Sequence, residues 1–176
     1  MLPPTGPWTG PWTGLLARLV VGGVWLYAGA LKLGDPEASV AAVRGYQILP
    51  TGFADTVGHV LPMLEVVLGA CLVLGLLTRF VGGLSALMQL AFVIGIASVW
   101  SRGIEINCGC FGDGGPNPNA SASYPWEIAR DLALMAASVL LVVRPRTPYA
   151  VDAVLFPNDA PHALPQKQVD HVHAEP

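Results

Sequence analysis

The chain has 176 residues, of which 53% are hydrophobic and 12% are charged, and its formal net charge is −3. Soluble domains carry about 25% charged residues, so this composition indicates a protein that faces lipid. The absence of a basic cluster excludes the usual electrostatic footprint of a nucleic-acid-binding protein. Three cysteines are too few for a disulfide scaffold, and the length suits one domain.

Residues 1–14 repeat a Thr-Gly-Pro-Trp pattern, and their prolines and glycines predict a flexible leader. Residues 15–33 form the first apolar run, which is about long enough to cross a hydrocarbon core of ~30 Å. No basic segment precedes this run, so we expect a retained span and not a cleaved signal peptide.

Small and charged residues recur at helical spacing along this first span. Five of them share one face: Arg18, Gly22, Trp25, Gly29 and Lys32. Small residues on a shared face let a neighbouring helix approach closely, so Gly22 and Gly29 are predicted helix-packing positions.

Residues 37–49 are amphipathic and follow a Gly-Asp-Pro turn, which predicts a short interfacial helix. Apolar runs over 56–77, 80–100 and 125–143 predict three further spans. The expected fold is therefore an all-α integral membrane protein, a bundle of four transmembrane helices with the interfacial helix between the first two. The tail, residues 144–176, is rich in proline and polar residues, and we expect it to be disordered.

The second span places Glu65 near the middle of the membrane, on the same face as Gly69. A bare carboxylate is costly there, so Glu65 is either a paired structural group or a functional proton site. Cys71 points away from this face and is interpreted as a small core residue. Gln89 in the third span is expected to hydrogen-bond between helices.

The loop over residues 101–124 carries Cys108 and Cys110 on either side of Gly109. Residues two apart lie within about the Cα separation that a disulfide needs, and glycine permits the tight bend. The spacing predicts a dithiol whose strained, exposed disulfide is labile. Half of a metal site and two unrelated residues in a turn remain as alternatives. The remainder of the loop is rich in Gly, Pro and Asn and is expected to lack regular structure.

Four spans place both termini on one side of the membrane and the Cys loop on the other. Counts of basic residues at the span ends do not decide the orientation. Oxidised thiol partners persist outside the cytoplasm, and Arg144 with Arg146 resembles a cytoplasmic stop. We therefore expect a multi-pass protein of the bacterial plasma membrane, with cytoplasmic termini and sulfurs that face the exterior aqueous phase.

This arrangement predicts that charged residues gather around the sulfurs, with Glu65 below them: Lys32, His59, Arg130 and Asp131. A nearby cation favours the thiolate, which is the nucleophile in disulfide exchange, and His59 is a candidate for moving protons. The alternatives are a local pair of Arg130 with a neighbouring acid and a polar helix cap at His59. No metal ligands are assigned.

Two helix signatures and the Cys loop carry a family resemblance. Residues 18–23 and 27–32 resemble the first-helix signature of the DoxX-like membrane proteins, and residues 62–69 resemble their second-helix signature. The Asn-Cys-Gly-Cys-Phe-Gly sequence of residues 107–112 narrows the resemblance to the branch that includes the MauE proteins of methylamine utilisation. The resemblance covers about residues 15–143.

This resemblance implies a four-helix bundle similar to the disulfide-handling DsbB and vitamin K epoxide reductase proteins. It also implies a role in thiol-redox maturation of exported proteins, with a thioredoxin-like partner. The chain lacks the second Cys pair typical of the quinone-coupled oxidases. No cofactor is assigned, and a quinone stays open as an electron acceptor.

Three functional hypotheses follow from the sequence. The first is a membrane thiol–disulfide redox protein that uses Cys108 and Cys110 with an extracytoplasmic thioredoxin-like partner. The second is a non-enzymatic scaffold subunit that docks a soluble redox enzyme, and the third is a small transporter that uses Glu65 as a proton site. The partners are the lipid bilayer and a protein, not a nucleic acid, and the sequence leaves the oligomeric state open.

Overall fold

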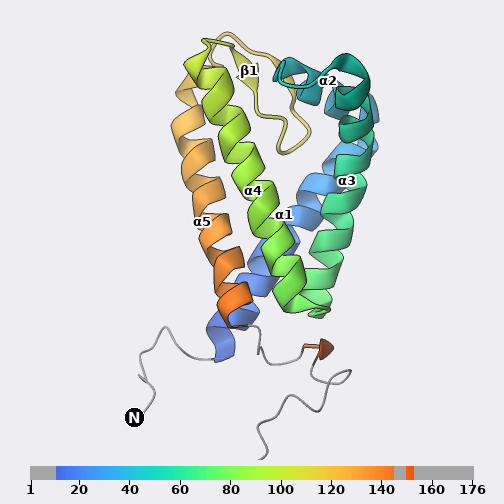
Figure 1. The fold of residues 1–176 in the computed structure, drawn as a ribbon, viewed down its shortest axis with the longest axis vertical. Coiled ribbons are helices and arrows are strands. Elements are labelled where there is room, and N and C mark those ends of the chain that lie inside the picture. Colours follow the sequence, from blue (N-terminus) through green and yellow to red (C-terminus); the bar gives the residue numbers. More distant parts are fainter. Residues whose placement is uncertain (1–10, 145–149, 153–176) are drawn as a thin grey trace, which may run out of the picture.

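The computed structural model describes residues 11–144 and 150–152. Its helices in that part of the chain are α1 (Pro11–Gly34), α2 (Pro36–Gly45), α3 (Thr51–Leu74), α4 (Thr78–Ser101) and α5 (Tyr124–Val143). The mostly helical fold confirms the all-α prediction. The four long helices form a bundle, with α2 and the loop between α4 and α5 at the same end (Figure 1).

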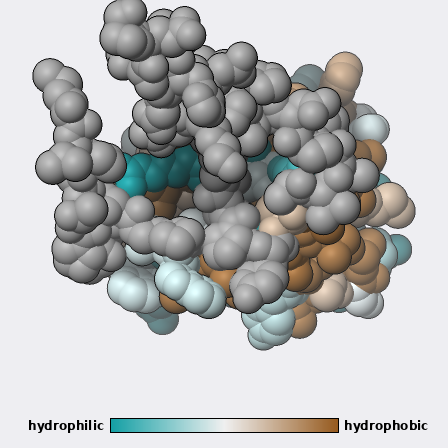
Figure 2. Space-filling view, turned by 90° about the horizontal axis from the view of Figure 1, so that it is seen from below, coloured by the Kyte–Doolittle hydropathy of each residue, from teal (hydrophilic) through white to brown (hydrophobic). Residues whose placement is uncertain are grey.

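Three of the helices are long and apolar enough to cross a membrane within the described residues: α1 from Trp12, α3 and α4. Helix α5 has 20 residues, close to the number that a bilayer requires, but three charged residues lie in its first two turns. Large hydrophobic side chains point outward on all four long helices, among them Leu16, Val67, Leu87 and Val143. The view along the bundle from the end opposite the Cys loop likewise shows hydrophobic side chains on its flank (Figure 2). This surface is that of a protein in lipid.

The helix ends differ from the predicted ones. Helix α1 begins at Pro11, inside the expected flexible leader, because proline suits the first helical position. Helix α2 ends at Gly45, before the expected limit, and Gln47 then takes a positive φ of 51°. Helix α3 ends at Leu74 because Gly75 adopts the left-handed conformation of a helix C-cap. The expectations for residues 1–10, 145–149 and 153–176 lie outside the described residues.

The predicted packing seam joins α1 to α3. All five positions predicted to share a face of α1 are buried. A Cβ atom added at Gly69 would lie 2.7 Å from the Leu26 amide nitrogen, and one at Gly29 would lie 2.8 Å from the Pro62 carbonyl oxygen. Atoms do not approach so closely, so glycine is required at both positions for the two backbones to meet.

A buried polar chain links α1, α4 and α5 in the middle of the bundle. The Trp25 indole donates to the Ser85 hydroxyl at 2.6 Å, and that hydroxyl lies 3.0 Å from the Ser138 hydroxyl. Ser138 in turn donates to Gln89 Oε1 at 3.1 Å. The predicted interhelical role of Gln89 is confirmed, and the polar groups of these helices satisfy one another away from water.

The loop between α4 and α5 contains regular structure, so the prediction that it lacks any is wrong. Strands β1 (Ile106–Asn107) and β2 (Gly115–Pro116) pair antiparallel, and the 3-10 helix η2 covers Ala120–Ala122. The buried Tyr124 hydroxyl accepts the Ile106 amide at 3.1 Å and lies 2.9 Å from the Ile104 carbonyl oxygen. This one side chain ties the loop to the start of α5.

At the opposite end of the bundle, residues 150–152 dock against the turn between α3 and α4. The Asp152 carboxylate accepts the Leu77 amide at 2.6 Å and the Thr78 amide at 2.8 Å. It therefore satisfies two of the amides that the first turn of α4 leaves without a helical partner.

Candidate dithiol site

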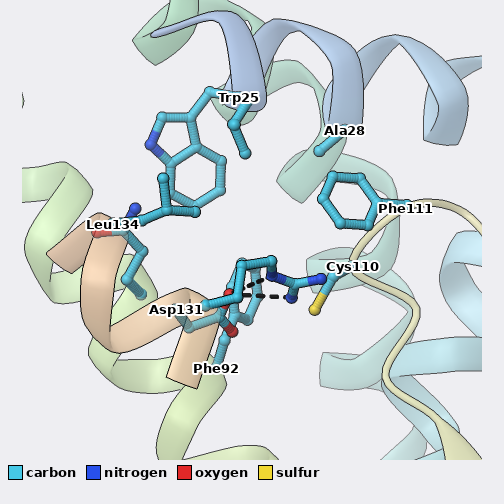
Figure 3. A pocket seen from close by; sticks show the side chains of 10 residues that line it. Trp25, Ala28, Phe92, Cys110, Phe111, Asp131 and Leu134 are labelled. Carbon is cyan, nitrogen blue, oxygen red and sulfur yellow. Dashed lines mark hydrogen bonds and ion pairs between the residues drawn. The ribbon is translucent and has the colours of Figure 1, made fainter. Parts of the chain in front are cut away.

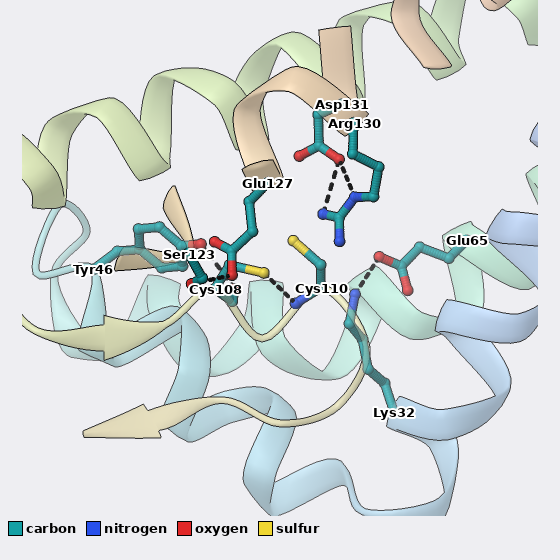
Figure 4. Close-up of polar contacts among 9 residues, drawn as sticks. All are labelled: Lys32, Tyr46, Glu65, Cys108, Cys110, Ser123, Glu127, Arg130 and Asp131. Carbon is teal, nitrogen blue, oxygen red and sulfur yellow. Dashed lines mark hydrogen bonds and ion pairs between the residues drawn. The ribbon is translucent and has the colours of Figure 1, made fainter. Parts of the chain in front are cut away.

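The loop brings both cysteines into the end of the bundle, against α2 and beside the start of α5 (Figure 4). Cys108 is 9% exposed and Cys110 is 6% exposed, and both are free thiols. The expected exposure of the two sulfurs to water is therefore wrong, because both side chains are nearly buried. Helices α2, α4 and α5 all contribute residues to their surroundings.

The two thiols occupy different electrostatic environments although one residue separates them. The Cys110 amide donates to Cys108 Sγ at 3.3 Å. Hydrogen bonds from the thiol and the amide of Cys110 lower the pKa of Cys108, against the opposing effect of burial. The same thiol–thiol hydrogen bond and burial raise the pKa of Cys110. Cys108 is thus the thiol that ionises first, and Cys110 is its proton-bearing neighbour.

Close contact with α2 holds the loop in place. Gly109 has a φ of +68°, and a Cβ atom added there would lie 2.5 Å from Ala42 Cβ. A Cβ atom at Gly114 would lie 2.1 Å from the same Ala42 atom. Glycine at these two loop positions is what allows the segment with the sulfurs to lie directly against α2.

Tyr46, just after α2, also anchors the Cys loop. Its hydroxyl donates to the Cys108 carbonyl oxygen at 2.8 Å, and its ring lies over Gly95, where an added Cβ atom would be 3.1 Å away. Arg102 donates to the Tyr46 carbonyl oxygen from the end of α4. Burial, with smaller contributions from both thiols, raises the pKa of the Tyr46 phenol, so it stays a hydrogen-bond donor.

Sequence reasoning did not identify Tyr46 or Tyr124 as parts of the site. Both hydroxyls bond to backbone atoms of the Cys loop, and neither spacing nor periodicity reveals such a partner. For Tyr46 the sequence contains only an indirect signal, its position between an amphipathic segment and a turn. A tyrosine that is buried there needs a hydrogen-bond partner for its hydroxyl.

Arg130 lies beside Cys110. Its Nη2 and Nε atoms lie 2.9 Å and 3.0 Å from Asp131 Oδ1, and its guanidinium is 4.8 Å from the centre of the Phe111 ring. Arg130, Asp131 and Cys110 line one cavity, whose walls include the aromatic rings of Trp25 and Phe92 (Figure 3). The cation is thus positioned where it stabilises negative charge on the sulfurs.

Lys32 approaches the sulfurs from α1. It lines a second cavity together with Cys108, Cys110 and Tyr46. Its ammonium pairs with Glu65 Oε1, and the two side chains are 3% and 0% exposed. The paired alternative for Glu65 is therefore the observed one, because a buried carboxylate is stable only when a cation compensates it.

The structure thus brings together four of the predicted supporting residues, Lys32, Glu65, Arg130 and Asp131, but it does not bring His59 to the sulfurs. His59 is exposed, and its Nδ1 lies 2.8 Å from the Asp55 carbonyl oxygen. His59 lies two turns inside α3, which begins at Thr51, so it is not a cap at the helix start either, and its side chain is turned away from the bundle. Cys71 packs against the buried cluster of Val21 and Leu72, far along the helix from the loop.

Among the described residues, no group of three or more His, Cys, Asp or Glu side chains is arranged to hold a metal ion. The chemistry that this site offers is that of two adjacent thiols between two cations.

The chain matches the family model described as methylamine utilisation protein MauE over residues 10–144. No curated protein and no solved structure matches it. Because the match covers more than half of the chain, this protein belongs to the MauE family. The family and the three apolar helices agree on a membrane protein.

Proposed function

We propose that this member of the MauE family is a membrane thiol–disulfide redox protein. Cys108 and Cys110 exchange a disulfide with an extracytoplasmic thioredoxin-like protein, and the exchange supports the maturation of exported proteins. The observation that carries the proposal is the hydrogen bond from the Cys110 amide to Cys108 Sγ, in a cavity that Lys32 also lines. Such a thiol is activated as a nucleophile and has its resolving partner beside it.

The proposal includes α5 as a fourth span. Helix α5 packs along α4 and α1 and exposes hydrophobic residues such as Val143. Its charged residues lie at the end that carries the Cys loop, where a headgroup region would meet them. In this arrangement α2 lies in the interface of the plasma membrane, both termini are cytoplasmic, and the domain spans residues 15–143.

The charged residues around the sulfurs have two different roles in this proposal. Lys32 and Arg130 stabilise the thiolate, and Glu65 and Asp131 hold these cations in place through their ion pairs. Because both sulfurs are nearly buried, a folded partner reaches Cys108 only when α2 moves away from the loop. The solvent-exposed ion pair of Arg44 with Asp55 offers little resistance to that movement, whereas the buried hydrogen bond from the Ser39 hydroxyl to the Gly58 carbonyl oxygen also ties α2 to α3 and has to break.

Trapping tests the proposal. In a strain that expresses a Cys71→Ser background, Cys110→Ser leaves Cys108 unable to resolve a mixed disulfide. We expect this variant to accumulate a covalent complex with an exported protein, seen on non-reducing gels and identified by mass spectrometry. The Cys71→Ser protein itself is the matched control and should give no complex. Absence of any complex from Cys108→Ser and from Cys110→Ser, with normal function of the double variant, would refute the proposal.

The burial of both sulfurs favours a second candidate, a scaffold subunit in which the Cys loop is a structural clip. Tyr46, Tyr124 and the glycine contacts with Ala42 hold this loop rigidly whether or not it does chemistry. The scaffold predicts that activity survives Cys108→Ser/Cys110→Ser and is lost when the seam at Gly22 and Gly69 is disrupted. The double variant Cys108→Ser/Cys110→Ser therefore separates the two functions, because only the redox function requires the thiols.

A further inference from the structure

Glu127 brings a carboxylate to the first turn of α5, beside the cysteines. Its Oε1 accepts the Ser123 hydroxyl at 2.8 Å, which fixes the side chain. Its Oε2 is buried and accepts no hydrogen bond within residues 11–144 and 150–152. Figure 4 shows the carboxylate directed to the Cys108 side of the pair, and its negative charge opposes the lowering of the Cys108 pKa by the hydrogen bonds from Cys110.

The other carboxylates around the sulfurs are occupied by cations. Glu65 pairs with Lys32, and Asp131 pairs with Arg130. Glu127 is the carboxylate near the dithiol that has no cation among the described residues. Consecutive turns of α5 therefore supply two different groups, a carboxyl group without a paired cation toward Cys108 and a guanidinium toward Cys110 (Figure 4).

A nearly buried thiol needs a local proton acceptor. Cys108 is 9% exposed, so bulk water has little access to its proton. Chemistry at a shielded sulfur is limited by proton transfer unless a neighbouring base accepts the proton, and a positioned carboxylate can do this.

We propose that Glu127 is the catalytic base of the dithiol, accepting the proton of Cys108 as its sulfur attacks a disulfide and returning it to the leaving thiolate. This inference rests on the proposed thiol–disulfide function and adds a residue to it. Ser123 is a positioning residue, because it acts through the Glu127 carboxylate.

In this reaction a disulfide of the partner protein is the oxidant of Cys108 and Cys110. The Cys108 proton passes to Glu127, the Cys108 sulfur bonds to one partner sulfur, and the partner S–S bond breaks. The departing partner thiolate takes the proton from Glu127. Cys110 then attacks Cys108 Sγ, forms the Cys108–Cys110 bond, releases the second partner thiolate and transfers its own proton to it. The dithiol loses two electrons, the partner disulfide gains two, and reduction of the pair is the reverse.

Several titratable or charged groups face this pair from the elements packed around it, and they contribute to any pH profile. They are Lys32 of α1, Glu65 of α3, which pairs with it, Tyr46 after α2, Tyr124, Arg130 and Asp131 of α5, and Cys110 in the loop itself. These groups are the same in every variant, so their contribution to the rate cancels when two variants are compared at one pH.

The test uses the full chain with Cys71→Ser in lipid nanodiscs and an uncharged probe, bis(2-hydroxyethyl) disulfide. The rate of Cys108–Cys110 oxidation is followed by quenching with N-ethylmaleimide and mass spectrometry. In a parallel Cys110→Ser protein, iodoacetamide alkylation against pH reports the pKa of Cys108. Because both reagents are neutral, a charge change at residue 127 does not alter their approach.

Glu127→Gln is expected to slow oxidation at neutral pH by about a hundredfold or more, the lower end of the range for general base catalysis. In the Cys110→Ser protein, Glu127→Gln is expected to move the pH midpoint of Cys108 alkylation to a lower value, because the substitution removes a negative charge near the thiolate. Electrostatics alone would accelerate the reaction of this variant, since more thiolate is present. A slower rate together with a lower midpoint is therefore specific to a base.

Asp113→Asn is the matched control, because it removes one negative charge from an exposed position of the same loop and should change neither measurement. Oxidation of Glu127→Gln at the wild-type rate or faster would overturn the proposal. If Glu127→Gln does not fold, Ser123→Ala decides: we expect oxidation about threefold or more slower, and an unchanged rate overturns the assignment. The purified protein and small probe need no cellular partner, so this result is separable from failure of the trapping experiment.

Discussion

At the scale of single residues, the site depends on contacts that leave no room for a side chain. Gly109 and Gly114 in the Cys loop both meet Ala42 of α2. Gly109 also has a positive φ, so both its conformation and its surroundings disfavour any other residue. The two glycines therefore help to position the sulfurs, because the loop could not lie against α2 if either residue had a Cβ atom.

Gly109→Ala is expected to open the Cys loop. Gly103→Ala is the matched control, because Gly103 has a φ of +66°, nearly the +68° of Gly109, but an added Cβ atom there meets nothing within 4 Å. Both variants pay the strain of a left-handed alanine, about 1 kcal/mol, and Gly109→Ala adds a clash of about 1–3 kcal/mol. Labelling of Cys108 and Cys110 by a neutral maleimide should therefore be roughly tenfold faster in Gly109→Ala than in Gly103→Ala.

The double variant Gly109→Ala/Ala42→Gly provides the check on this explanation. Removal of the Ala42 methyl group relieves the clash, so labelling should return to the rate of Gly103→Ala. Equal labelling rates of Gly109→Ala and Gly103→Ala would show that contact with α2 does not shield the thiols.

At the scale of the helices, α1 and α3 pack with their backbones in contact because glycines on both leave no side chain between them. An added Cβ atom at Gly22 would lie 3.0 Å from the Gly69 carbonyl oxygen, and one at Gly69 would lie 2.8 Å from the Gly22 carbonyl oxygen. The same seam places Lys32 opposite Glu65. The packing of α1 against α3 therefore determines where the Lys32 ammonium group lies relative to the two cysteines.

Gly69→Ala is expected to destabilise the bundle, whereas Gly23→Ala should not. An added Cβ atom at Gly23 meets nothing within 4 Å, so alanine there only improves helix propensity, by up to about 1 kcal/mol. At Gly69 the same methyl group forces α1 and α3 apart, at a cost of about 1–3 kcal/mol. Thermal unfolding in one detergent should show a lower midpoint for Gly69→Ala only. A common shift of both variants would contradict close packing at this seam.

At the scale of the whole molecule, the bundle gathers elements that are distant in sequence around the Cys loop. The end of α1, α2 and the start of α5 all lie beside this loop, and residues 150–152 lie at the opposite end (Figure 1). In the proposed arrangement of four spans, the two ends of the bundle lie in different compartments.

Introduced cysteines test this topology, because the native sulfurs are shielded. In a background with all three native cysteines replaced by serine, Asp113→Cys marks the Cys loop, Arg79→Cys the turn between α3 and α4, and Arg144→Cys the end of α5; all three sites are exposed. We expect an impermeant maleimide to label Asp113→Cys on intact spheroplasts, and the other two only after lysis. Labelling of Arg144→Cys on intact spheroplasts together with Asp113→Cys would show that α5 does not span the membrane.

The sequence by itself determined the all-α membrane character, the shared face of α1, the interhelical role of Gln89 and the candidate dithiol. These features are local: helical periodicity, apolar composition and the spacing of Cys108 and Cys110 are properties of short segments. The same periodicity also indicated which residues of α1 would be buried, because one face of a helix is fixed by its spacing.

Only the tertiary structure decided the rest of the site. The Lys32–Glu65 pair, the attachment of Tyr46 to Cys108, the exposure of His59 and the nearly complete burial of the sulfurs all depend on how separate elements pack. A loop rich in glycine is compatible with many conformations in isolation. It takes a single one here because Ala42, Tyr46 and Tyr124 hold it from outside its own segment, and no local pattern encodes those contacts.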